Sequence, residues 1–213
     1  MKILKTLLAA TALAFGLFSA ALAQEAPDVL VKRVTAEVME TVKSDKEIKA
    51  GNRQRIQSVV ETKILPHLDL ERGTALTMGR HWRAASQQQR QKLIEEFRAL
   101  LMYTYSGAMS QIGDQKLEFM PLRDDPEDGE VVVRFQVKQT RTGDPVQVAY
   151  RLHKTQDGWK VYDVNVLGAW MSETYKASFS EEIARSGIDG LIRTLEEKNK
   201  RLAELSGKNS KSS

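Results

Sequence analysis

The chain has 213 residues, of which 41% are hydrophobic, with 32 Lys and Arg against 28 Asp and Glu. This composition is typical of a globular protein and excludes a largely disordered chain or one built mainly from membrane spans. Lys2, Lys5, Lys208 and Lys211 lie near the two ends, so the remaining 28 basic residues balance the 28 acidic ones. They gather in no single stretch, and we therefore predict no nucleic-acid partner. The absence of Cys excludes disulfides and thiol chemistry.

Residues 1–23 have the three parts of a secretory signal peptide. Lys2 and Lys5 give a positive start, an apolar run spans residues 6–18, and small residues lead to Ala23. The apolar run is shorter than the ~20 residues of a membrane-spanning helix, so a retained anchor is the weaker alternative. We predict cleavage after Ala23 and release of the mature chain into a bacterial-type periplasm. Because no Cys follows the leader, a lipoprotein is excluded.

The first half of the mature chain has the periodicity of amphipathic helices. Apolar residues recur at steps of three and four over residues 27–43. A second helical stretch ends at Pro66, which lacks a backbone donor. Asp69 is placed to cap a short helix that follows. Ser86 and Gln89 have the spacing of a capping box, which predicts the start of the longest amphipathic helix.

The period then changes from helical to the two-residue alternation of β-strands. Four segments show it, at residues 117–119, 131–138, 146–153 and 159–167. Short turns rich in Gly, Pro and Asp separate them, which predicts antiparallel neighbours. The fourth segment is apolar on both sides, so we expect it to be central or covered on both faces.

After Gly168 the helical period returns, breaks at Gly187 and continues to Leu205. Residues 206–213 are rich in Ser, Lys and Gly, and we predict a disordered tail. The whole pattern predicts a single α+β domain over residues 24–205. In it, helices from both ends of the chain cover one face of a curved antiparallel sheet of about four strands, which together form a cone. Such a cone can be packed solid or can enclose an apolar cavity.

No catalytic or metal-binding motif is recognisable in this sequence. The three histidines lack the i, i+4 spacing of a helical zinc site, and the glycine patterns of nucleotide-binding loops are absent. Asp163 is the one acid inside an apolar strand, and such acids can perform acid–base chemistry. One hypothesis is therefore an enzyme that acts on a small hydrophobic substrate through Asp163. The other is a structural carboxylate that is hydrogen-bonded to backbone or to a basic group.

Three motifs in a fixed order carry a family resemblance. They are TMGRHWR at residues 77–83, VYDVNVLG at 161–168 and GIDGL at 187–191. With them, the chain resembles the MlaC family, also known as the toluene-tolerance or Mla auxiliary family, over about residues 27–205. None of the motifs is a catalytic signature, and their specificity lies in their order and spacing together.

The resemblance implies an NTF2-like, cone-shaped fold and a periplasmic phospholipid carrier rather than an enzyme. The implied partners are the MCE-domain subunit of an inner-membrane ABC transporter and an outer-membrane lipoprotein complex. It implies no cofactor other than the phospholipid cargo, and we expect a monomer. Acyl chains would be buried between the apolar face of the sheet and the helices, whereas the charged headgroup would stay in water.

Periodicity alone selects twelve side chains as candidates to bind lipid. They are Phe97, Leu101, Tyr105, Phe119, Val133, Phe135, Val148, Tyr150, Val164, Val166, Met171 and Tyr175. Each is equally a candidate for solid core, because one apolar face serves both purposes.

Overall fold

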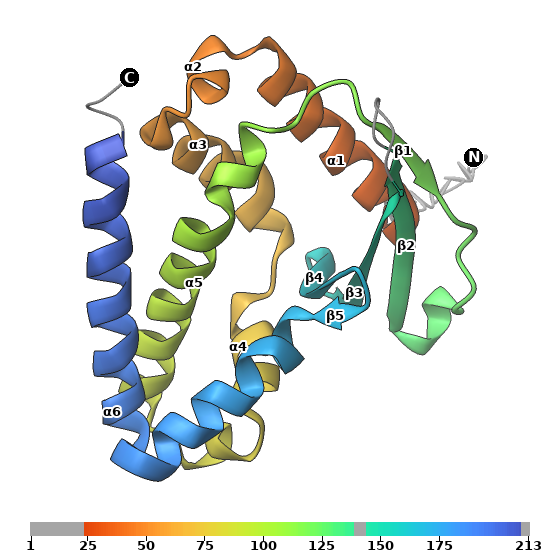
Figure 1. Cartoon of the computed structure of the whole chain (residues 1–213). Helices are drawn as coiled ribbons and strands as arrows, with labels where there is room; N and C mark the ends of the chain where they lie inside the picture. Colours follow the sequence, from red (N-terminus) through yellow and green to blue (C-terminus); the bar gives the residue numbers. More distant parts are fainter. Residues whose placement is uncertain (1–23, 139–143, 210–213) are drawn as a thin grey trace, which may run out of the picture.

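The structure is a computed structural model that describes residues 24–138 and 144–209, with side chains as far as residue 205. A group of helices lies beside an antiparallel sheet, and α1 crosses the sheet (Figure 1). The predicted signal peptide lies outside the described residues. Within the described part of the chain, no helix is both long enough and apolar enough to span a bilayer.

The N-terminal half forms a succession of helices that ends at the sheet. Its elements are α1 (Pro27–Ser44), α2 (Lys46–Lys49), α3 (Arg53–Val59), the π-helical turn η1 (Val60–Ile64), the 3-10 turn η2 (Leu65–His67), α4 (Leu70–Met78), the 3-10 turn η3 (Gly79–Ala84) and α5 (Gln87–Met109). Two predicted caps are confirmed. The Asp69 carboxylate accepts a hydrogen bond from the backbone N–H of Arg72 at 2.8 Å. Ser86 and Gln89 form a reciprocal capping box at the start of α5.

The sheet has five antiparallel strands in the order in which they occur in the chain. They are β1 (Lys116–Phe119), β2 (Glu130–Lys138), β3 (Val146–Thr155), β4 (Gly158–Val166) and β5 (Ala169–Trp170), with a short 3-10 turn, η4 (Pro126–Asp128), before β2. The predicted α+β class and antiparallel order are confirmed. The short fifth strand was not predicted. It follows a turn at Leu167 and Gly168, which have φ angles of 53° and 90°.

A β-bulge explains why β4 is apolar at both odd and even positions. Leu152 of β3 pairs with Val161, whereas the next residue, Arg151, pairs with Asp163, so Tyr162 is the extra residue. Val161 and Val164 therefore face the same side of the sheet although three positions separate them. As predicted, β4 is not an edge strand. The edge of β4 that does not pair with β3 pairs with β5 and forms a single bridge with Leu68.

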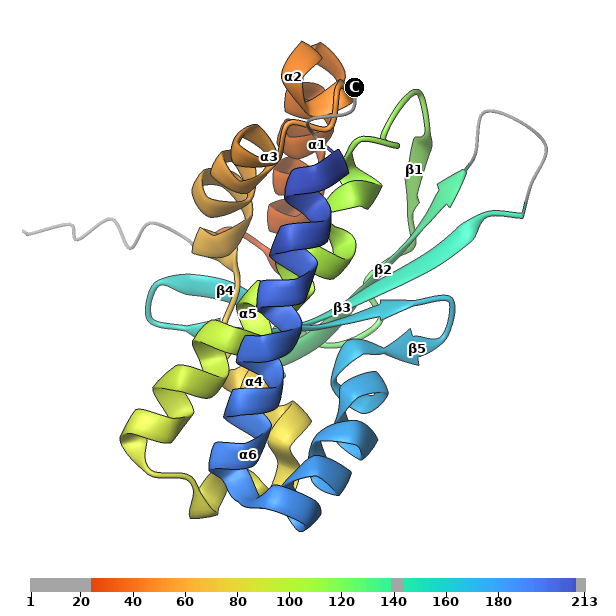
Figure 2. The same ribbon diagram turned by 60° about the vertical axis from the view of Figure 1, so that its left-hand side comes forward.

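The last described element is α6 (Met171–Asn209), whose part after Gly187 lies alongside α5 (Figure 2). The predicted break at Gly187 is present, with φ 73° and ψ −179°, a conformation available essentially to glycine. The predicted tail, residues 206–213, starts inside α6. Its last four residues lie outside the described part of the chain.

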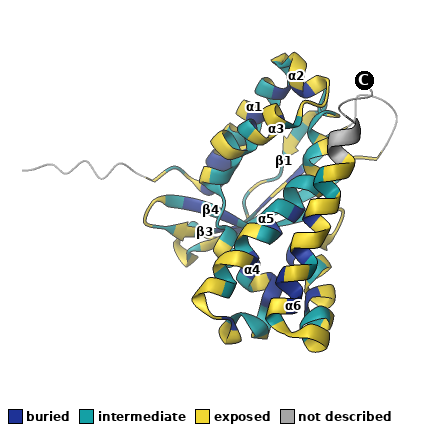
Figure 3. Ribbon diagram, turned by 90° about the vertical axis from the view of Figure 1, so that its left-hand side faces the viewer, coloured by how far each residue is buried: buried dark blue, intermediate teal, exposed yellow. Residues whose placement is uncertain are grey.

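Three separate hydrophobic clusters hold these elements together. The first joins α4, α5 and α6 around Phe97 and Leu191, and the second joins α1 to the sheet around Val133 and Leu152. The third joins α1, α2 and α3 around Ile48. The faces of α6 turned away from these clusters are exposed (Figure 3). The interior is thus divided among several small cores rather than filled by one.

The helical half meets the sheet along β4. The backbone N–H of Asp69 donates to the carbonyl oxygen of Val161 at 2.8 Å. One turn further along α4, the backbone of Gly73 approaches Tyr162 so closely that a Cβ on residue 73 would lie 2.7 Å from the Tyr162 carbonyl oxygen. Only glycine allows this approach without a shift of backbone.

We predict that Gly73→Ala lowers the free energy of unfolding by about 1–3 kcal/mol, because the new methyl group forces α4 away from β4. Gly107→Ala in α5 is the matched control, since a Cβ there has no neighbour within 4 Å. The control should gain up to about 1 kcal/mol from helix propensity. Urea unfolding measures both. Equal effects of the two substitutions would contradict the close approach at Gly73.

Candidate functional site

An apolar cavity, which we term the central cavity, lies between α5, the η1–η2 segment and β4. Its volume is about 360 Å³. The walls include Ile64 and Leu68 before α4, Leu101 and Tyr105 on α5, and Val166 at the end of β4. The rim of the central cavity, where β4 ends, carries exposed apolar side chains. Tyr105 is 41% exposed, and Leu167, in the adjoining turn, is 69% exposed.

A second apolar cavity, the α1 cavity, lies between α1 and the inner face of the sheet. Its volume is about 310 Å³. Its walls include Leu30, Val34 and Val38, which α1 presents on one face because they are spaced by four residues. Tyr150 and Val161 supply part of the opposite wall. Burial raises the pKa of Tyr150 to about 12, as expected for a phenol in apolar surroundings.

The two cavities share part of their walls. Ile64, Leu68, Met109 and Val164 line both of them. The shared residues come from the irregular η1 segment, from the residue before Asp69, from the end of α5 and from β4. The cavities are therefore neighbouring compartments of one apolar interior.

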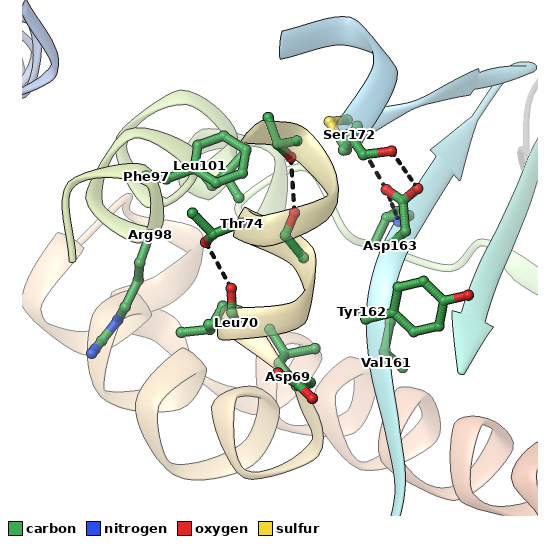
Figure 4. A pocket seen from close by; sticks show the side chains of 15 residues that line it. Asp69, Leu70, Thr74, Phe97, Arg98, Leu101, Val161, Tyr162, Asp163 and Ser172 are labelled. Atoms are coloured by element: carbon green, nitrogen blue, oxygen red, sulfur yellow. Dashed lines mark hydrogen bonds between the residues drawn. The ribbon is translucent and has the colours of Figure 1, made fainter. Parts of the chain in front are cut away.

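A third, smaller space of about 100 Å³, the α4 cavity, continues the central cavity toward α4 (Figure 4). Two buried threonines in its wall, Thr74 and Thr77, donate their hydroxyls to the carbonyls of Leu70 and Gly73, at 2.7 and 2.9 Å. They therefore add no unsatisfied hydroxyl to the cavity. Arg98 directs its guanidinium away from the cavity to Glu61, at 3.0 Å.

Asp163, the candidate catalytic acid, is used structurally. It is 4% exposed and accepts four hydrogen bonds. Its Oδ1 accepts from the backbone N–H groups of Val164 and Ser172, and its Oδ2 accepts from the Ser172 hydroxyl at 2.7 Å and from Arg151 at 2.9 Å. The Arg151 guanidinium also lies 3.7 Å from the ring centroid of Trp170. Four protein donors thus hold this carboxylate at the start of α6, which favours the structural hypothesis over the catalytic one.

Seven of the twelve predicted lipid-binding residues lie in the walls of these cavities. They are Phe97, Leu101, Tyr105, Tyr150, Val164, Val166 and Met171. This places them where a ligand can reach, and their contact with lipid stays a prediction.

The other five predicted residues lie away from the three cavity walls. Phe119, Val133, Phe135 and Val148 belong to the cluster between α1 and the sheet, where Val133 and Phe135 are buried. Tyr175 packs edge-on against Phe97, at 5.2 Å between ring centroids, in the cluster of α4, α5 and α6. Burial, followed by the neighbouring Tyr105 hydroxyl, raises the pKa of Tyr175. Direct contact of these five with lipid also stays a prediction.

Sequence reasoning missed the walls contributed by the N-terminal half. These are residues of α1, of η1, of the stretch before α4 and of the first turn of α4, including Leu30, Val34, Ile64, Leu68 and Leu70. One signal was present in the sequence. Ile64 and Leu65 precede Pro66 and Leu68 follows it after His67, so the chain stays largely apolar where the helix must stop.

The fold and its linked cavities define an α+β protein with a divided apolar interior. The MlaC protein family matches residues 32–197. A phospholipid-binding protein from Ralstonia solanacearum, solved in complex with a phospholipid, is 40% identical, with a TM-score of 0.78 over 83% of this chain and 98% of that one.

Two further relatives align over most of their length. The intermembrane phospholipid transport system binding protein MlaC of Haemophilus influenzae is 22% identical over 90% of this chain and 91% of its own. The toluene tolerance protein ttg2D of Pseudomonas putida is 26% identical over 78% of this chain and 77% of its own. The chain belongs to the MlaC family.

We predict that Asp163→Asn lowers the free energy of unfolding by about 1.5–3 kcal/mol, because the NH₂ group that replaces one carboxylate oxygen cannot accept the hydrogen bonds that the Ser172 hydroxyl and Arg151 donate to Oδ2. Asp114→Asn is the control, since that side chain is 91% exposed. Urea denaturation measures both variants. If Asp163→Asn leaves the free energy of unfolding unchanged, the carboxylate does not hold α6 to the sheet.

Proposed function

We propose that this protein is a periplasmic carrier that binds phospholipid by burying its acyl chains in the central and α1 cavities. The observation that carries the proposal is the pair of neighbouring apolar cavities, each within the roughly 300–1,000 Å³ typical of ligand sites. The phospholipid bound by the Ralstonia relative supports it, because that protein shares this fold at 40% identity.

The driving force is the removal of hydrocarbon from water. Each buried CH₂ contributes about 0.8 kcal/mol, so ten of them contribute about 8 kcal/mol before the cost of association is subtracted. A phosphate has the opposite preference, because enclosing a charge without partners costs several kcal/mol. The headgroup therefore stays at the protein surface while the chains lie inside.

As a carrier, the protein takes lipid from one membrane complex and delivers it to another. Family membership supports the MCE-domain subunit of an inner-membrane ABC transporter and an outer-membrane lipoprotein complex as its two partners. The name of the Haemophilus relative, an intermembrane transport binding protein, agrees with this role. The predicted leader, residues 1–23, would place the mature domain of residues 24–205 in the periplasm between them.

The direct test is to purify the mature protein from cells, extract it with organic solvent and analyse the extract by mass spectrometry. We expect phospholipid in near-stoichiometric amount, and uptake of lipid again by the delipidated protein. Protein that neither carries nor takes up phospholipid would overturn the proposal.

Val164 is the position at which to obstruct the interior, since it lines all three apolar cavities. We predict that Val164→Trp weakens phospholipid binding about tenfold or more, because excluding only two CH₂ groups costs about 1.6 kcal/mol. Val132→Trp is the matched control, because Val132 pairs with Arg151 on the opposite face of the sheet. Equal lipid retention by both folded variants would contradict the assignment of the cavity walls.

A further inference from the structure

A polar pocket lies at the end of β4 opposite the rim of the central cavity. Its volume is about 230 Å³. Three basic side chains line it from three elements: Arg33 from α1, His67 from η2 and Lys160 from the start of β4. Lys160 and Val166 are six residues apart, about 20 Å along an extended strand. This pocket is therefore separate from the rim at Tyr105 and Val166.

The polar pocket adjoins the α1 cavity. Leu30 and His67 line both spaces. On α1, Leu30 and Arg33 are spaced by three residues and so are neighbours on the helix surface. A molecule whose apolar chain lies in the α1 cavity can thus place a polar end in this pocket.

The cations of the pocket retain capacity to bind an anion. Lys160 donates to the Pro66 carbonyl oxygen at 2.5 Å, so among the described residues its partner is neutral. Arg33 uses three of its five N–H groups on Glu25 and Glu37, which leaves two. Glu25 and Asp157 also line the pocket, and an anion must be accommodated beside them.

The pKa of His67 responds both to burial and to the charged groups around it. Burial lowers this pKa most, and the positive charges of Arg33 and Lys160 lower it further. Glu25 and Glu37 act in the opposite direction but less strongly. The two cations therefore outweigh the two carboxylates at the imidazole.

We propose that this pocket binds the phosphate group of a phospholipid whose acyl chains enter the α1 cavity, with Lys160, Arg33 and His67 as its partners. The inference rests on the proposed function and adds to it a defined headgroup site with charge selectivity. Uncharged diacylglycerol, which has the same chains and no phosphate, would fill the cavity but leave the pocket empty.

The test is NMR titration of the His67 imidazole, which is one of three in the chain and is assigned with a His67→Gln variant. The mature protein is delipidated and then loaded with phosphatidic acid or with diacylglycerol of the same chains. Bound phosphate stabilises the protonated imidazole, so we expect the pKa of His67 to rise with phosphatidic acid and not with diacylglycerol. Lys160→Gln should reduce the rise, whereas Lys154→Gln, on the neighbouring strand β3, should preserve it.

Each other outcome has a defined meaning. If phosphatidic acid binds and the pKa of His67 does not rise, the headgroup site is overturned and the carrier function stands. If inorganic phosphate raises the pKa in the empty protein and lipid loading does not, the pocket binds free phosphate and the lipid assignment is overturned. If neither lipid binds, the carrier function fails, and the headgroup site fails with it.

Discussion

The junction along β4 is the constraint on which the rest of the structure depends. On one edge, β4 pairs with β3 over its whole length, which anchors it in the sheet. On the other edge it meets the helical half at several points, among them the bridge from Leu68, the close approach of Gly73 and the hydrogen bonds that Ser172 donates to Asp163. These contacts are polar or backbone contacts of fixed geometry. They hold α4 and α6 at a set distance from the sheet without side-chain packing across the whole interface.

That distance explains why an apolar interior stays open instead of collapsing. The apolar surfaces of α4, α5 and α6 are buried against one another, and those of α1 and the sheet are buried together, so each half has its own core. Most of the apolar surface of each half is therefore buried within that half, and little remains to drive the two halves together. Between them runs the η1–η2 segment, where a π turn, a 3-10 turn and Pro66 prevent regular helix packing. The cavities lie along this segment.

Local sequence signals predicted the elements well, and the cavity walls less well, for a physical reason. Asp69, the Ser86–Gln89 pair and Gly187 affect the backbone within a few residues of themselves, so the sequence shows both partners of each interaction side by side. Val133 and Val164 both lie on the inner face of the sheet, but α1 covers Val133 whereas Val164 lines the central cavity. Alternation identifies the apolar face of a strand and carries no information on what lies opposite. The bulge at Tyr162 likewise depends on pairing with β3.

The central claim is that hydrocarbon occupies the space beside β4, and a crystal structure with a brominated acyl chain tests it most directly. The mature protein is loaded with a phospholipid brominated in mid-chain, and the bromine atoms are located by anomalous scattering. The account predicts bromine in the central or α1 cavity, in contact with Leu68 or Val164. Bromine on the outer face of the sheet, with side chains filling both cavities, would contradict it.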